Sequence, residues 1–277
     1  MSTRRFDIRR PGPAGLAGRG FVIAYVTLLV ALPILALVVR AVQAGPEAFA
    51  DAMSAEIARD ALVLSVGTAA ITALLNGVLG TATAWVLVRY DFPGRSLVSA
   101  IVDLPLSIPT LVAGVMLVVL LGPQSSIGAW LEANDIPIVY ARGSIVLALL
   151  LVTLPFVVRA VEPVLLELDP AEEEAARTLG AGRFLTFTRV ILPAIVPAAL
   201  SGSIRSFARS LAEFGSIAVV AGNIPYQTLT APVYVFGAIE SGSPDAAVAM
   251  SLSLFGIAAF VMTLARYVER NVGGRNG

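Results

Sequence analysis

The sequence contains no cysteine, no histidine and no lysine, so all nineteen basic residues are arginine. Without cysteine and histidine there are no disulfides, no thiol chemistry, no Cys/His metal site and no histidine-based acid–base catalysis. Without lysine there is no P-loop lysine to hold the phosphates of ATP. We therefore expect a chain that has no enzymatic activity, no ATPase site and no cofactor of its own.

Charge of either sign is also scarce. Only 14% of the residues are charged, 57% are hydrophobic, and the mean hydropathy is +0.85. A soluble domain carries about 25% charged residues, so this composition indicates an integral membrane protein in contact with lipid. The nineteen basic and nineteen acidic residues cancel, and no basic surface for nucleic acid is predicted.

Six apolar stretches are long enough to cross a bilayer, which takes about 20 residues. These stretches are 20–42, 61–88, 97–121, 144–164, 194–221 and 246–267. The first could be a secretory signal, because arginines precede it, but its apolar run is longer than that of a signal peptide. We therefore expect a retained span. The predicted fold is all-α and integral to the membrane, with six transmembrane helices.

The arginines orient these spans, because cytoplasmic loops carry the excess of positive charge. Arginines cluster before the first span, after the second, after the fourth and after the last, whereas each other loop holds one at most. This pattern predicts two cytoplasmic termini. The predicted organisation is a cytoplasmic tail (1–19), a first span with an outer loop (20–54), a transmembrane core (55–270) that includes a cytoplasmic segment (169–193), and a second tail (271–277).

The cytoplasmic segment carries the start and stop signals of short helices. Asp169 can accept hydrogen bonds from the free N–H groups of a first turn, and Pro170 suits the first helical position. Gly180 suits a left-handed helix end. A second short helix is expected over about 183–190, before Pro193 opens the next span. The segment predicts a helical pair across the cytoplasmic face, with alanines small enough to enter a groove of another protein.

The same segment resembles the EAA coupling signature of ABC importer permeases. EAA, three residues, G, nine residues and VILP run from Glu174 to Pro193, with Val190 where the family has isoleucine. In that family the segment is the coupling helix, which sits in a cleft of the ATPase subunit; an ordinary amphipathic loop helix is the alternative. The resemblance implies that the following residues couple to an ATPase: Glu173, Glu174, Ala175, Ala176, Leu179, Gly180, Leu192 and Pro193.

Longer stretches resemble the sulfate/thiosulfate permeases. They include RYDFPGRSLVSAIVDLPLSIPTLVAG (89–114), LPFVVRAVEPVLLELDPAEEEAARTLGA (154–181) and RSLAEFGSIAVVAGNIPYQT (209–228), and the resemblance covers about 60–270. AGNIP (221–225) is more similar to the T-type subunit than to its W-type partner. The resemblance implies a type I ABC importer permease fold with cytoplasmic coupling helices. It also implies ABC ATPase subunits that use ATP, a second permease subunit (W-type or an identical copy) and an extracytoplasmic anion-binding protein.

The function implied by the resemblance is that of the permease subunit of an ATP-driven sulfate or thiosulfate importer in the bacterial cell membrane. A molybdate or tungstate permease is the first alternative, since those close relatives share LAEFGS-like sequence. A secondary transporter or channel is the second, and it would need neither an ATPase nor a coupling segment. The EAA-like motif and the lack of an evident inverted repeat favour the ABC importer.

Charged and amide side chains within the spans are costly in lipid and mark candidate sites. Arg205, Arg209 and Glu213 are four residues apart in the fifth predicted span and are expected on one helix face. Arg209 could present its charge to a translocated oxyanion while Glu213 holds it in place. The alternative is an Arg–Glu pair that locks this helix against a neighbour. Asn76 is expected to make an interhelical hydrogen bond.

The sequence DLPLSIPT (103–110) carries two prolines four residues apart, which cannot sit in an unbroken helix. Broken helices free backbone groups that line cavities in transporters. Ser107, Pro109 and Thr110 are therefore further candidates for a translocation path, and a proline-kinked packing helix is the alternative. Asp103 lies near the cytoplasmic end of its span, and an interfacial or a helix-pairing role is expected for it.

Overall fold

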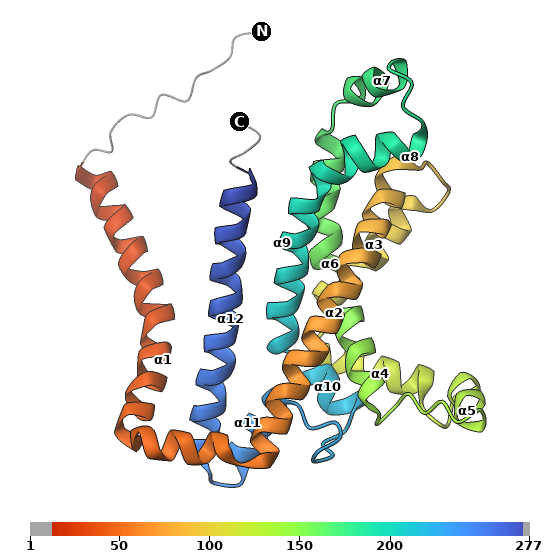
Figure 1. The fold of residues 1–277 in the computed structure, drawn as a ribbon. Coiled ribbons are helices and arrows are strands. Elements are labelled where there is room, and N and C mark those ends of the chain that lie inside the picture. Colours follow the sequence, from red (N-terminus) through yellow and green to blue (C-terminus); the bar gives the residue numbers. More distant parts are fainter. Residues whose placement is uncertain (1–12, 274–277) are drawn as a thin grey trace.

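The computed structural model describes the backbone of residues 13–273 and the side chains of 18–266. The arginines before residue 13, on which the orientation of the first span rests, lie outside the described residues, as does the end of the predicted tail after residue 273. Every regular element of the described chain is a helix (Figure 1), which confirms the all-α prediction.

The membrane-spanning and connecting helices are, in chain order, α1 (Pro13–Ser54), α2 (Glu56–Arg89), α3 (Arg95–Ser107), α4 (Thr110–Leu121), α5 (Ser126–Ala133), α6 (Arg142–Glu167), α7 (Pro170–Thr178), α8 (Arg183–Thr186), the π-helix η1 (Phe187–Ile191), α9 (Leu192–Leu211), α10 (Gly215–Val220), α11 (Ala231–Glu240) and α12 (Pro244–Gly273). Five stretches are long and apolar enough to cross a membrane: α1, α2, α6, α8 to α9, and α12. The pair α3 and α4, bent by 117°, gives a sixth span if it is counted as one. The six predicted spans are therefore found, and the third is broken.

The first helix differs from its prediction in extent. α1 begins inside the predicted tail, and it continues past the predicted span through Pro46 to Ser54 (Figure 1). The chain turns at Gly45, whose φ of 88° is open to glycine without strain. Pro46 then has the fixed φ that suits the first turn of a new helix. The stretch 46–54, predicted as an outer loop, is therefore helical.

The fifth span is displaced toward the N-terminus relative to its prediction of 194–221. It runs from Arg183 to Leu211 through the π-helix, and the apolar stretch that follows forms the separate short helix α10. Glu213 lies in the break between α9 and α10, so the expectation that it shares a helix face with Arg209 is wrong. Hydropathy could not reveal this break, because the residues on both sides of it are apolar.

The centre of the bundle is formed by α2, α6 and α9, which approach closely at small residues. A Cβ atom on Gly202 of α9 would lie 2.7 Å from Cα of Val157 in α6. Asn76 is fully buried between these helices and donates hydrogen bonds to Thr153 (2.8 Å) and Ser206 (3.2 Å). This confirms the expected interhelical hydrogen bond and fixes the three helices to one another.

The first span packs against the last, and α12 packs in turn against α9 of this centre (Figure 1). The most apolar 18-residue window of α1 has none of its residues buried within the chain. An ion pair of 3.0 Å between Arg40 and Asp245 joins α1 to the start of α12. In a membrane protein, apolar side chains exposed in this way face lipid or another subunit.

Candidate functional site

The polar segment forms the helical pair that its sequence predicts. α7 projects beyond the spans, at the end of the molecule where α1 begins and α12 ends, and α8 begins the stretch that continues into the fifth span (Figure 1). The predicted topology places this segment on the same side of the membrane as both termini, which agrees with the position of these helix ends. The segment is also continuous with a span, because α8 passes through η1 directly into α9.

Local chemistry explains where α7 starts and stops. The side chain of Asp169 accepts a hydrogen bond of 2.9 Å from the backbone N–H two residues further on, and Pro170 occupies the first helical position. Gly180 has a φ of 86°, the left-handed conformation expected at a helix end. The N–H of Ala181 then donates to the carbonyl of Ala176 at 3.0 Å, which satisfies an otherwise free acceptor.

The predicted coupling residues divide between two places. Glu174, Ala175, Leu179 and Gly180 are exposed on the projecting α7 and its end, while Ala176 is half-buried. Leu192 and Pro193 lie in the first turn of α9, at the membrane end of the segment. The first group can therefore contact another protein directly, whereas the second connects the segment to a span.

Large apolar side chains stand exposed on this projecting part. Leu179 is 89% exposed at the end of α7, and Phe184 is 80% exposed at the start of the stretch that continues into the fifth span. Apolar side chains presented to water outside the membrane mark protein interaction sites. α7 and α8 therefore have the chemistry of a docking surface.

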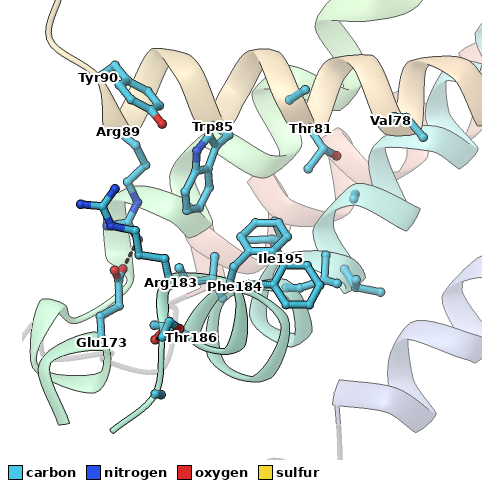
Figure 2. Close-up of a pocket in the computed structure, with 18 of the residues that line it drawn as sticks. Val78, Thr81, Trp85, Arg89, Tyr90, Glu173, Arg183, Phe184, Thr186 and Ile195 are labelled. Atoms are coloured by element: carbon cyan, nitrogen blue, oxygen red, sulfur yellow. Dashed lines mark hydrogen bonds and ion pairs between the residues drawn. The ribbon is translucent and has the colours of Figure 1, made fainter. Parts of the chain in front are cut away.

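Glu173 does not share this exposure, although it lies between exposed neighbours. Its side chain is 12% exposed and points toward α2, where its Oε1 lies 2.5 Å from Nη2 of Arg89 (Figure 2). The contact is an ion pair whose angles fall outside hydrogen-bond geometry. Arg177 approaches the other carboxylate oxygen at 3.6 Å.

A cavity of about 1390 Å³ lies between the C-terminal half of α2, the α7–α8 segment and the start of α9 (Figure 2). Arg89, Arg177 and Arg183 line one part of it together with Glu173, and mostly aromatic and aliphatic side chains line the rest. Trp85 and Phe187 meet edge to face across it, with ring centroids 5.3 Å apart. The segment is thus attached to α2 by apolar as well as charged contacts.

The third span is broken where its two prolines predict. α3 ends at Ser107 and α4 begins at Thr110, with Pro109 between them in an extended conformation. Ser107 and Pro109 are exposed, while Thr110 is half-buried. A Cβ atom on Gly215 would lie 2.6 Å from Oγ1 of Thr110, so the break in the third span packs against the start of α10.

Arg209 and Glu213 form the ion pair that their sequence indicates, at 2.9 Å. Glu213 is 1% exposed, and its Oε1 accepts hydrogen bonds from the backbone N–H (3.0 Å) and the hydroxyl (2.8 Å) of Ser216. The Arg209 side chain is 33% exposed. The break after α9 thus lies beside the break before α4, because Gly215 contacts Thr110. The five candidates for a translocation path come from these two adjacent breaks.

Arg159 is a charged residue that the sequence analysis missed. In α6 it donates to both carboxylate oxygens of Asp103 (2.7 and 2.5 Å) and to the carbonyl and hydroxyl of Ser99 on α3. It also pairs with Glu162, one turn further along α6. Asp103 therefore pairs two helices, as expected. The sequence signal that could have revealed this site is an arginine and a glutamate, Arg159 and Glu162, within one apolar span.

Comparison with known proteins agrees with this architecture. The family described as "Binding-protein-dependent transport system inner membrane component" matches residues 76–274. The chain is 44% identical over 216 residues to a probable sulfate transport system permease protein cysT of Nephroselmis olivacea, covering 78% of this chain and 76% of the relative. It is 41% identical over 249 residues to the sulfate transport system permease protein CysW of Synechocystis sp. (90% of each chain) and 36% identical over 270 residues to CysT of Escherichia coli (96% and 98%).

Solved structures show the same fold at lower identity. A chain of a bacterial alginate ABC transporter, crystallised with its alginate-bound periplasmic protein, has a TM-score of 0.76 at 19% identity over 93% of this chain and 94% of that one. A chain of the inward-facing MetNI methionine ABC transporter has a TM-score of 0.56 at 18% identity over 76% and 96%. These likenesses confirm the predicted ABC permease fold. The chain belongs to the family of binding-protein-dependent transport system inner membrane components.

Proposed function

We propose that this chain is the permease subunit of an ATP-driven ABC importer for sulfate or thiosulfate. The observation that carries the proposal is the exposed α7–α8 segment with EAA spacing, which is continuous with a span and presents Leu179 and Phe184 to a partner. The cargo is suggested by relatives that are named sulfate permeases and are 36–44% identical over most of their length.

The permease needs no covalent chemistry and no cofactor for this function. ATP is used by two partner ATPase subunits, whose closure moves α7 and α8 and through them the spans. The transporter then opens outward, an extracytoplasmic anion-binding protein delivers the oxyanion, and hydrolysis resets the inward-open state. A second permease chain, an identical copy or a W-type subunit, completes the path. Both termini lie in the cytoplasm with the coupling segment.

The translocation path of this proposal passes the two adjacent helix breaks. Arg209 is one-third exposed and can meet a passing oxyanion, while the buried Glu213 and its hydrogen bonds to Ser216 hold the guanidinium in place. The paired carboxylate also weakens the attraction, which favours release. Ser107, Pro109 and Thr110 supply hydroxyl and backbone groups at the other break.

Proline substitutions at two nearby glycines test the coupling assignment. Gly180 has a φ of 86°, which proline cannot adopt, whereas Gly182 has a φ of −70°, which is close to that of proline. In an importer co-expressed with its ATPase and binding protein, Gly180→Pro should lower sulfate uptake at least about tenfold, the scale of typical coupling free energies, while Gly182→Pro should not. Glu174→Lys should act as Gly180→Pro does. Normal uptake by correctly inserted Gly180→Pro and Glu174→Lys would contradict the coupling role.

Competition between anions tests the cargo. Uptake of labelled sulfate is measured with molybdate present at one tenth of the sulfate concentration. Unchanged uptake supports the sulfate assignment. If trace molybdate abolishes uptake, the chain is still an ABC importer permease, but its cargo is molybdate or tungstate. The test uses the complete importer, because the binding protein shares in the choice of anion.

A further inference from the structure

Glu173 occupies the position in α7 where the EAA resemblance predicts an ATPase contact, but its side chain is directed into the protein. Its carboxylate lies 2.5 Å from the guanidinium of Arg89, the last residue of α2, and the two side chains are 12% and 25% exposed. Glu172 and Glu174, on either side, are exposed. Glu173 can reach a partner protein only by giving up this ion pair.

The end of α2 is shaped to hold the carboxylate. One turn before Arg89, the ring of Trp85 lies under its guanidinium, 5.2 Å from the central carbon to the ring centroid (Figure 2). A cation over an aromatic face is attracted by the ring and loses rotational freedom. Trp85 also contacts Phe187 of η1 edge to face. Both the start and the end of the α7–α8 segment are thereby fixed to the last two turns of α2.

Little else holds α7 against the spans. No residue of α7 is buried. Among the residues that the structure describes, the Glu173–Arg89 pair is the one ion pair or hydrogen bond that joins α7 to a spanning helix, since Arg177 belongs to α7 itself. The contact of α7 with α2 therefore depends on this pair, whereas its link to α6 is the two-residue connection through Leu168 and Asp169.

We infer that Arg89, supported by Trp85, is a positioning residue that binds Glu173 and so transmits the movement of α7 to α2. A force on α7 then reaches the membrane along the chain in both directions, through Leu168 and Asp169 into α6 and through α8 and η1 into α9, and also across the ion pair into α2. Since α2 and α9 are also joined by Asn76 and Ser206, the ion pair makes both helices follow the coupling segment together. Glu173 is accordingly an internal link, and Glu174 is left to face the ATPase. This inference rests on the proposed coupling function.

The test compares two neighbouring glutamates in the complete importer, reconstituted into proteoliposomes with its ATPase and binding protein. Glu173→Gln keeps the size and hydrogen-bonding capacity of the side chain and removes only its charge, and Glu172→Gln is the matched exposed control. We expect Glu173→Gln to retain the ATPase in the complex and to lower the sulfate transported per ATP hydrolysed about tenfold. Glu172→Gln should match the wild type in both measurements.

Variants of the arginine separate positioning from folding. Arg89→Gln should reproduce the loss caused by Glu173→Gln, and Arg89→Lys, which keeps the charge, should recover a large part of the transport per ATP. A purely structural role would lower the amount of folded complex and leave this ratio unchanged.

Two results would overturn the inference. One is a wild-type ratio of transport to hydrolysis in Glu173→Gln. The other is loss of the ATPase from the Glu173→Gln complex with a normal ratio in whatever complex remains, since that would make Glu173 a direct ATPase contact. A wild-type chain that binds no ATPase would instead contradict the proposed function and, with it, this inference.

Discussion

Neutralising either member of the Arg209–Glu213 pair should destabilise the chain, but by different amounts. The two side chains differ in exposure, since Arg209 is 33% exposed and Glu213 is 1% exposed. Arg209→Gln leaves a carboxylate buried without its counter-charge. Glu213→Gln leaves a guanidinium that can reach water or headgroups along its long stem.

The magnitudes follow from this difference in burial. Removing one partner of a buried ion pair costs about 3–5 kcal/mol, which we expect for Arg209→Gln. In Glu213→Gln the amide oxygen can still accept the two hydrogen bonds from Ser216, so only the charged contact is lost. That loss is about 1 kcal/mol, the scale of an ion pair in which one partner is reached by solvent.

A double-mutant cycle measures this asymmetry. Thermal unfolding in detergent, followed by the fluorescence of the two tryptophans, gives the stability of each variant. Arg209→Gln should unfold at the lowest temperature, and the double variant should be more stable than Arg209→Gln alone, because it removes the stranded carboxylate. Equal losses for the two single variants, or strictly additive losses in the double variant, would refute the reasoning.

Two packing predictions use the same unfolding assay. Gly202→Ala should destabilise the chain by about 1–3 kcal/mol, because the added Cβ would lie 2.7 Å from the backbone of Val157. In Gly77→Ala the added Cβ would lie 2.7 Å from the hydroxyl of Ser203, which can rotate away, so this variant should be near neutral. Similar unfolding temperatures for the two variants would show that α6 and α9 are not in fixed contact. Asn76→Ala should cost about 1–3 kcal/mol, since it removes two buried hydrogen bonds that join α2 to α6 and α9. An unchanged unfolding temperature would count against these hydrogen bonds.

The features that sequence predicted correctly depend on neighbouring residues. Asp169 and Gly180 set the ends of α7 through contacts within a few residues, so their chemistry can be recognised without a structure. The break at Pro109 is local in the same way, because proline excludes a continuous helix whatever surrounds it. Hydropathy revealed the spans, although it displaced the fifth, because each must carry about 20 apolar residues to cross lipid.

The features that it missed depend on distant partners. The fifth span ends at Leu211, and the helix after it starts at Gly215, which lies against Thr110 about a hundred residues away. No apolar pattern in the sequence records that contact. Glu173 was grouped with its exposed neighbours in the motif, since only the folded chain brings Arg89 to it. The helix after Gly45 carries enough polar residues to be taken for a loop.

Uptake of labelled sulfate into proteoliposomes that contain this chain, its permease partner, the ATPase and the binding protein tests the central claim most directly. The account predicts uptake that requires internal ATP and the binding protein, and that persists when ionophores collapse all ion gradients. Uptake that proceeds without ATP and disappears with an ion gradient would contradict it and would identify a secondary transporter.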